Sequence, residues 1–125
     1  MRLIDTTVAV DHLRGDGRAT TLLERIIRED KLVAASELTR FEVLAGMPPG
    51  EREQTESFFS SFSWIPVDEQ ISRLAGRLAW DHRRPHRGIG VVDYLIAATA
   101  TLVGAGLLTT NVRHFPMFAG LEPAY

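Results

Sequence analysis

Three carboxylates and one amide occupy positions where a folded chain could bring them together. Asp5 follows an apolar run at the start of the chain, and Asn111 follows a second apolar run near its end. Glu42 and Asp93 lie in segments with helical spacing. Their side-chain oxygens are the ligands that Mg²⁺ and Mn²⁺ prefer, and such a cation relieves the repulsion among clustered carboxylates. These residue types predict a metal centre that could activate water against a phosphodiester bond.

Glu42 stands on the apolar side of its segment. Leu38 lies four residues before it and Ala45 three residues after it, so the three side chains share one face of a helix. Burial would raise the pKa of this carboxyl and neutralise it unless a cation or a hydrogen-bond donor meets it. The alternative is that Glu42 reaches solvent at the edge of the stripe or pairs with Arg40.

Asp5 and Asp93 also have ordinary structural interpretations. Each stands where a helix could start, and aspartate is a common cap or turn residue. A helix N-terminus favours an ionised carboxylate, and the same place suits a metal ligand or a phosphate. Either role, or both together, is compatible with the spacing.

The segments that must position these residues alternate between strand and helix patterns. Ligand sites in sheets of parallel strands gather at the carboxyl ends of the strands, where Asp5 and Asn111 fall. Such an alternation predicts an α/β fold with a mainly parallel sheet covered on both faces. Strands are predicted at residues 1–4, 32–35, 64–67 and 107–109, with a weak one near Leu121, and helices at 18–29, 36–45 capped by Ser36, 51–61, 68–82 capped by Asp68, and from near Asp93 to Gly104.

Composition indicates one ordinary globular domain over residues 1–125, with 45% hydrophobic and 24% charged residues. The absence of cysteine excludes disulfides, thiolate nucleophiles and cysteine zinc sites. The opening MRLIDTT has no signal-peptide pattern, so a cytoplasmic protein is expected. The most apolar uncharged stretch, residues 94–108, is shorter than the roughly 20 residues that span a bilayer, so no membrane association is expected.

Charge is distributed unevenly, although the net charge is only −2. Between Arg73 and Arg113 six arginines accompany two acids, and the rest of the chain holds 8 basic and 14 acidic residues. Local positive charge beside acidic chemistry suits an enzyme that acts on a nucleic-acid backbone. A solvated arginine-rich helix face explains the same pattern.

Four motifs in order resemble the VapC-type toxins of the PIN-domain ribonuclease family. They are LIDTTVAVDHL, SELTRFEVLAG, VVDYLIAATA and GLLTTNVRHFP, which together span nearly the whole chain. The resemblance implies a three-layer α/β/α sandwich around a central, mainly parallel sheet of four to five strands. It also implies a Mg²⁺- or Mn²⁺-dependent endoribonuclease that cleaves single-stranded regions of RNA.

Site roles follow from the same resemblance. Asp5 and Asp93 become the principal metal ligands, and Glu42 becomes a third catalytic carboxylate that orients water or a second ion. Asn111 stands where the family often has aspartate, so a neutral oxygen would complete the metal site. Supporting roles go to Thr6 and Thr110, as hydrogen-bonding partners of the ligands, and to Arg113, as a phosphate contact.

The family resemblance further implies a VapB-like antitoxin as partner, RNA as substrate and a homodimer. Two non-enzymatic alternatives stay open. A receiver-like signalling domain is disfavoured because it needs a lysine after its last strand, and the only lysine is Lys31. A PIN-like binding module without nuclease activity draws its support from Asn111.

Histidines and aromatic residues receive less weight. His82 and His86 are four apart, but Pro85 between them disrupts a helix, so loop positions are expected. His12 and His114 are given no role, because metal-dependent hydrolysis needs no histidine. The aromatic residues Phe58, Phe59 and Phe62 are interpreted as core or, alternatively, as a dimer or antitoxin surface.

Overall fold

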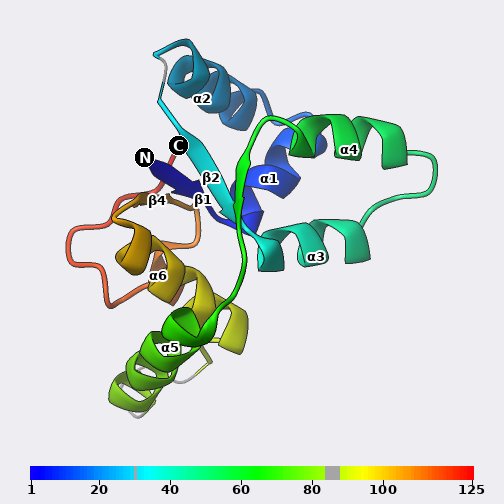
Figure 1. The fold of residues 1–125 in the computed structure, drawn as a ribbon. Coiled ribbons are helices and arrows are strands. Elements are labelled where there is room, and N and C mark those ends of the chain that lie inside the picture. Colours follow the sequence, from blue (N-terminus) through cyan, green and yellow to red (C-terminus); the bar gives the residue numbers. More distant parts are fainter. Residues whose placement is uncertain (30, 84–87) are drawn as a thin grey trace.

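A computed structural model describes residues 1–29, 31–83 and 88–125, and in it the chain forms one parallel sheet with helices on both faces (Figure 1). All three strand pairings are parallel, and the strand order is β3-β2-β1-β4. The fold therefore confirms the predicted α/β class. The strands are β1 (Arg2–Ile4), β2 (Val33–Ser36), β3 (Ser63–Ile65) and β4 (Gly106–Leu108).

Helices occupy most of the rest of the described chain. Those of the first half pack on one face of the sheet, and α5 and α6 pack on the other (Figure 1). They are α1 (Thr6–Leu13), α2 (Gly17–Arg28), α3 (Glu37–Ala45), α4 (Arg52–Phe59), α5 (Glu69–His82) and α6 (Val91–Val103), followed by the 3₁₀ helix η1 (Val112–His114).

Neighbouring residues of each central strand point to opposite faces of the sheet, and both faces are covered. In β1, Leu3 belongs to the cluster under α6, whereas Ile4 belongs to the cluster under α1 and α2. Both side chains are fully buried. This alternation explains why the strands read as continuous apolar runs and why the architecture has three layers.

Local capping sets the helix boundaries that the sequence predicts. Ser36 accepts a hydrogen bond from the backbone N–H of Leu38 at the start of α3, and Asp68 accepts one from Ile71 at the start of α5. Gly104 ends α6 in the left-handed conformation, with φ of 67°, which glycine adopts without strain.

Three local predictions differ from the structure. Helix α6 begins at Val91 after Gly90, so Asp93 lies within the first turn and is not its cap. The described segment 109–125 contains no strand near Leu121, and its backbone instead forms η1 and turns. His82, for which a loop position was expected, is the last residue of α5, whereas His86 and its neighbours Arg84, Pro85 and Arg87 lie outside the described residues.

The phenylalanines of the α4 region belong to the core. Phe59 and Phe62 are 2% and 9% exposed, and Phe58 packs against them and stacks on His12. The alternative that they form a dimer or antitoxin surface is therefore wrong for Phe59 and Phe62, whereas Phe58 is only partly buried. Large exposed apolar side chains lie elsewhere, and among them are Phe41, Trp80 and Val91.

Within the described part of the chain, no helix has both the length and the apolar character needed to cross a bilayer.

Candidate metal centre

Strand order brings the two ends of the chain together at one edge of the sheet. β1 pairs with β4, with Ile4 opposite Leu108, and the backbone N–H of Asp5 continues the pairing by donating to the carbonyl of Leu108 at 2.9 Å. Asp5 and the segment beginning at Thr109 therefore emerge side by side at the carboxyl ends of adjacent strands. This is the location where parallel sheets bind ligands.

Asp5 is buried and held by three donors. Its Oδ1 accepts from the backbone N–H of Thr6 at 2.8 Å, and its Oδ2 accepts from the hydroxyls of Thr109 at 2.7 Å and Thr7 at 3.2 Å. The first of these bonds also makes Asp5 the N-cap of α1. The cap and ligand interpretations are thus compatible, because the carboxylate can serve both.

Burial raises the pKa of Asp5 above its ordinary value of 3.8, and the negative charge of Asp93 raises it further. The hydrogen bonds from Thr109, Thr6 and Thr7 act in the opposite direction but do not cancel the effect of burial. A nearby cation would favour the ionised form of this carboxyl.

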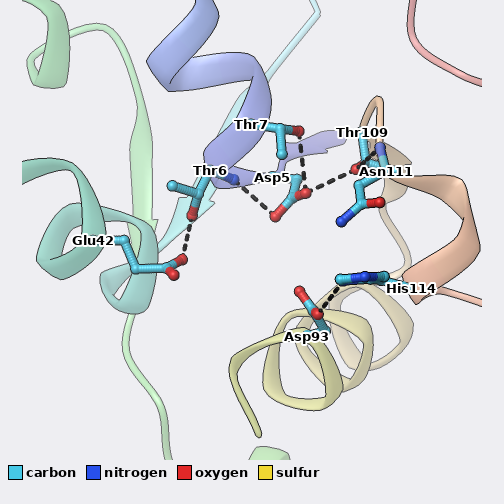
Figure 2. A network of polar contacts seen from close by, with 8 residues as sticks. All are labelled: Asp5, Thr6, Thr7, Glu42, Asp93, Thr109, Asn111 and His114. Carbon is cyan, nitrogen blue, oxygen red and sulfur yellow. Dashed lines mark hydrogen bonds and ion pairs between the residues drawn. The ribbon is translucent and has the colours of Figure 1, made fainter. Parts of the chain in front are cut away.

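Asp93 reaches the same place from the first turn of α6. Its Oδ2 lies 2.8 Å from Nδ1 of His114, and its side chain is 19% exposed. Figure 2 shows Asp93 facing Asp5 from the other side of the centre, with Asn111 and His114 between them on one flank.

Glu42 is half-buried and lies to one side of the two aspartates (Figure 2). The hydroxyl of Thr6 donates to its Oε1 at 2.6 Å, and the same hydroxyl lies 3.2 Å from that of Thr39. A donor does meet this carboxylate, as its place on the apolar stripe requires. The alternative pairing with Arg40 is wrong, because Arg40 pairs with Glu37 and lies over the ring of Trp64.

The segment after β4 supplies the remaining polar groups. The backbone N–H of Asn111 donates to the hydroxyl of Thr109 at 3.0 Å, and Figure 2 shows the Asn111 side chain beside Asp5 with its amide nitrogen toward the centre. Rotating the amide by about 180° would present its oxygen, since the group carries a donor end and an acceptor end. Arg113 is exposed on η1, where a phosphate could reach it.

The structure places the two threonines that the sequence suggested as supporting residues in different surroundings. The hydroxyl of Thr6 donates a hydrogen bond to Glu42, which is one of the candidate metal ligands. Thr110 was expected to hydrogen-bond a metal ligand, but no hydrogen bond joins it to Asp5. The bond to Asp5 comes from Thr109, and Thr110 donates its backbone N–H to the hydroxyl of Thr7 at 3.4 Å.

The donor set fits a hard divalent cation. Asp5 and Asp93 face each other, and the pKa of Asp5 is raised in part by Asp93. Once its amide is rotated, Asn111 would add a neutral oxygen, which would make an all-oxygen set. Among the residues that the structure describes, no three His, Cys, Asp or Glu side chains form a group that could hold a metal ion. The arrangement is therefore a carboxylate pair with an amide, and Glu42 is linked to it through Thr6.

Sequence reasoning missed three side chains of this centre, which are Thr7, Thr109 and His114. The run TTN after β4 contains two threonines, and only the strand register decides which hydroxyl reaches Asp5. His114 is separated from Asp93 by 21 residues, and no local spacing links the two.

Comparison with known proteins identifies the fold. The PIN domain family matches residues 2–120. Ribonuclease VapC19 of Mycobacterium tuberculosis is 58% identical over 125 residues, which is the full length of both chains. Ribonuclease VapC10 of the same organism is 41% identical over 125 residues, which is 100% of this chain and 93% of that protein.

Solved structures agree with this. A chain in a toxin-antitoxin complex from Klebsiella pneumoniae superposes with a TM-score of 0.84 at 27% identity, covering 100% of this chain and 98% of that one. A chain in FitAcB from Neisseria gonorrhoeae gives a TM-score of 0.76 at 26% identity, covering 92% and 91%. By family match, sequence identity and fold together, this chain belongs to the PIN-domain family and, within it, to the VapC type.

Proposed function

We propose that the protein is a metal-dependent endoribonuclease, the toxin of a toxin-antitoxin pair, which hydrolyses RNA phosphodiester bonds. The observation that carries the metal-dependent part is the buried Asp5 facing Asp93, with a pKa raised by burial and by that second carboxylate. A cation between the two carboxylates would compensate their charge and offset the cost of burying Asp5 in its ionised form. The names of the two mycobacterial relatives supply the reaction class, because both are ribonucleases.

In this proposal Asp5 and Asp93 hold Mg²⁺ or Mn²⁺, and Asn111 contributes a neutral oxygen. When bound, the cation lowers the pKa of a water molecule and stabilises negative charge on the phosphate. Thr109, Thr7 and the backbone of Thr6 keep the Asp5 carboxylate oriented toward the centre.

Glu42 acts beside the pair and not within it. Its Oε1 is occupied by the hydroxyl of Thr6, which leaves Oε2 to orient water or a second ion. Arg113 contacts a phosphate of the RNA from the exposed surface of η1.

A VapB-like antitoxin is the proposed partner, since the superposed Klebsiella chain comes from a toxin-antitoxin complex. A pocket of about 350 Å³ adjoins the centre and has Thr6 and Glu42 in its wall. Val10, Leu13 and Met47 give it an apolar surface, which suits side chains of a bound peptide. A homodimer is proposed as well.

The test is RNA cleavage by the purified protein. We expect cleavage with Mg²⁺ or Mn²⁺, none with a chelator, and recovery when the cation is restored. A matched pair of variants locates the chemistry: Asp93→Asn should abolish cleavage, whereas Asp81→Asn, an exposed aspartate on α5, should not change it. Cleavage that persists in chelator contradicts the metal-dependent mechanism.

A binding module without nuclease activity is the second candidate, and Asn111 in place of an aspartate favours it. The same experiment separates the two. A protein that binds RNA but does not cleave it with either cation would be this module. Membership of the PIN-domain family excludes the receiver-like alternative.

A further inference from the structure

His114 is the one histidine that the structure places at the acidic centre, among the residues it describes. Its Nδ1 lies 2.8 Å from Oδ2 of Asp93 (Figure 2). The His114 side chain is 41% exposed and that of Asp93 19% exposed, so the bond is partly shielded from water. Nothing in the proposed reaction uses this contact.

The backbone holds His114 firmly in place. Its own N–H donates to the carbonyl of Asn111 at 3.1 Å, which closes the turn η1. The next residue, Phe115, is 1% exposed and packs in the core cluster with Ile96 of α6. One anchored turn therefore presents both the Asn111 amide and the His114 ring to the centre.

The chemistry of the bond fixes the roles of its atoms. If the carboxylate of Asp93 is the acceptor of this bond, the donor is the N–H at Nδ1 of the imidazole. This bond engages Oδ2 of Asp93, and Figure 2 shows the other carboxylate oxygen pointing away from His114, on the side of Asp5 and Glu42. The ring thereby sets the rotation of the carboxylate and selects the oxygen that faces Asp5.

We propose that His114 is a positioning residue, whose Nδ1–H holds Asp93 so that one carboxylate oxygen stays free for the cation. The inference rests on the proposed function, because it needs Asp93 to bind the cation. Partners of this kind, bound to a metal ligand and not to the metal, change metal affinity by about 10–100-fold when removed.

A graded set of variants tests the position of the donor. His114→Ala removes it, and His114→Asn keeps an amide N–H near the place of Nδ1. His114→Gln moves the donor outward, near the place of Nε2. The control is His12→Asn, because His12 is also partly buried but bonds Thr20 and stacks on Phe58, outside the acidic centre.

Mn²⁺ affinity without RNA is the main readout, measured from the electron paramagnetic resonance signal of free Mn²⁺. We expect His114→Ala and His114→Gln to bind Mn²⁺ about 10–100-fold more weakly than wild type, and His114→Asn to recover most of the loss. His12→Asn should bind as wild type does. Thermal melting without metal identifies any variant that fails to fold. If His114→Ala does not fold, the comparison of His114→Asn with His114→Gln decides the result, because both side chains stay polar and similar in size to histidine.

The proposal is overturned if His114→Ala binds Mn²⁺ as tightly as wild type, or if His114→Asn is as weak as His114→Ala. Long-range ¹H–¹⁵N spectra of the metal-free protein give a second readout, since they show which ring nitrogen carries the proton. A bare Nδ1 in neutral His114 would also overturn it. If the wild-type protein itself neither binds Mn²⁺ nor cleaves RNA, the proposed function fails first, and that result is distinct from unchanged affinity in His114→Ala.

Discussion

At the scale of single residues, the centre is governed by the cost of keeping Asp5 charged. Its folded-state pKa lies above 3.8, so the folded protein binds this proton more tightly than the unfolded chain does. The ionised form therefore lowers the free energy of unfolding. The free energy of unfolding begins to fall as the pH rises past 3.8. The fall is complete once the pH exceeds the raised folded-state pKa.

Asp5→Asn should separate stability from activity. The amide oxygen can still accept from Thr6, and the amide NH₂ can donate to the hydroxyls of Thr7 and Thr109, which rotate to accept. Without metal at neutral pH, we expect a melting temperature equal to or above that of wild type, with the difference vanishing below pH 3.8. RNA cleavage should fall by about 100-fold or more, because the cation loses a charged ligand.

Calorimetric melting across pH and a cleavage assay make this measurement. A metal-free Asp5→Asn protein that is markedly less stable than wild type at neutral pH would contradict the charge argument.

Thr109→Val should raise the pKa of Asp5 still further, because the Thr109 hydroxyl is the strongest of the contacts that lower it. We expect the acid limb of the pH–rate profile to move to higher pH, and unfolding to cost about 1–3 kcal/mol less because the Asn111 N–H also loses its acceptor. The control is Thr99→Val, an equally buried threonine that bonds Leu95 within α6. The acid limb of the pH–rate profile of Thr99→Val should match that of wild type. A shift in Thr99→Val without one in Thr109→Val would refute the role given to Thr109.

At the scale of elements, each ligand candidate depends on the end of a strand or the first turns of a helix. Asp5 ends β1 and caps α1, and Asp93 lies in the first turn of α6. Glu42 lies in the second turn of α3, and its hydrogen bond with Thr6 links α3 to α1. Helix starts thus determine the geometry of the centre.

Removing the cap of α3 tests this dependence. Ser36→Ala deletes the hydroxyl oxygen that accepts from Leu38, and Asp68→Ala deletes the equivalent cap of α5, which carries no candidate ligand. Both variants should lose about 1 kcal/mol of unfolding free energy in urea titrations. Only Ser36→Ala should also lower kcat for RNA cleavage, since α3 carries Glu42; equal losses of kcat in both would show that stability alone is responsible.

At the scale of the whole molecule, exposed apolar side chains are where we propose that a second copy binds. Phe41 on α3 and Val91 at the start of α6 are 66% and 75% exposed. Leu38 of α3 and Val92 of α6 both pack against the core cluster that contains Leu3 and Ile96. A stable dimer buries about 1,200–2,000 Å² in total, and apolar anchors of this kind lie at the centre of such interfaces.

Phe41→Ser should therefore shift the protein from dimer to monomer, measured by light scattering during gel filtration. Ile27→Ser is the control, because Ile27 is 52% exposed and lies on α2, away from the two helices that carry Phe41 and Val91. A monomeric wild-type protein would show that the interface does not exist. Dissociation caused by Ile27→Ser but not by Phe41→Ser would show that the interface lies elsewhere.

Local patterns in the sequence were sufficient for the four strands, for most of the helices and for the identity of the acids, but they did not predict α1 (Thr6–Leu13) as a helix. Strands and helices follow from side-chain periodicity and from caps such as Ser36 and Asp68, which involve residues only two or three apart. Asp5 and Asn111 were predicted at a functional edge because both follow apolar strands. The family resemblance then supplied the expected partners and metal.

Only the tertiary structure decided which of these groups meet. The bond between Asp5 and Thr109 spans 104 residues and exists because β1 lies beside β4, a neighbour relation that no spacing in the sequence specifies. The choice of Thr109 over Thr110 depends on strand register, since successive side chains of an extended chain point in opposite directions. The contact of His114 with Asp93 likewise arises from the packing of η1 against α6, because contacts between distant segments are determined by how the layers pack.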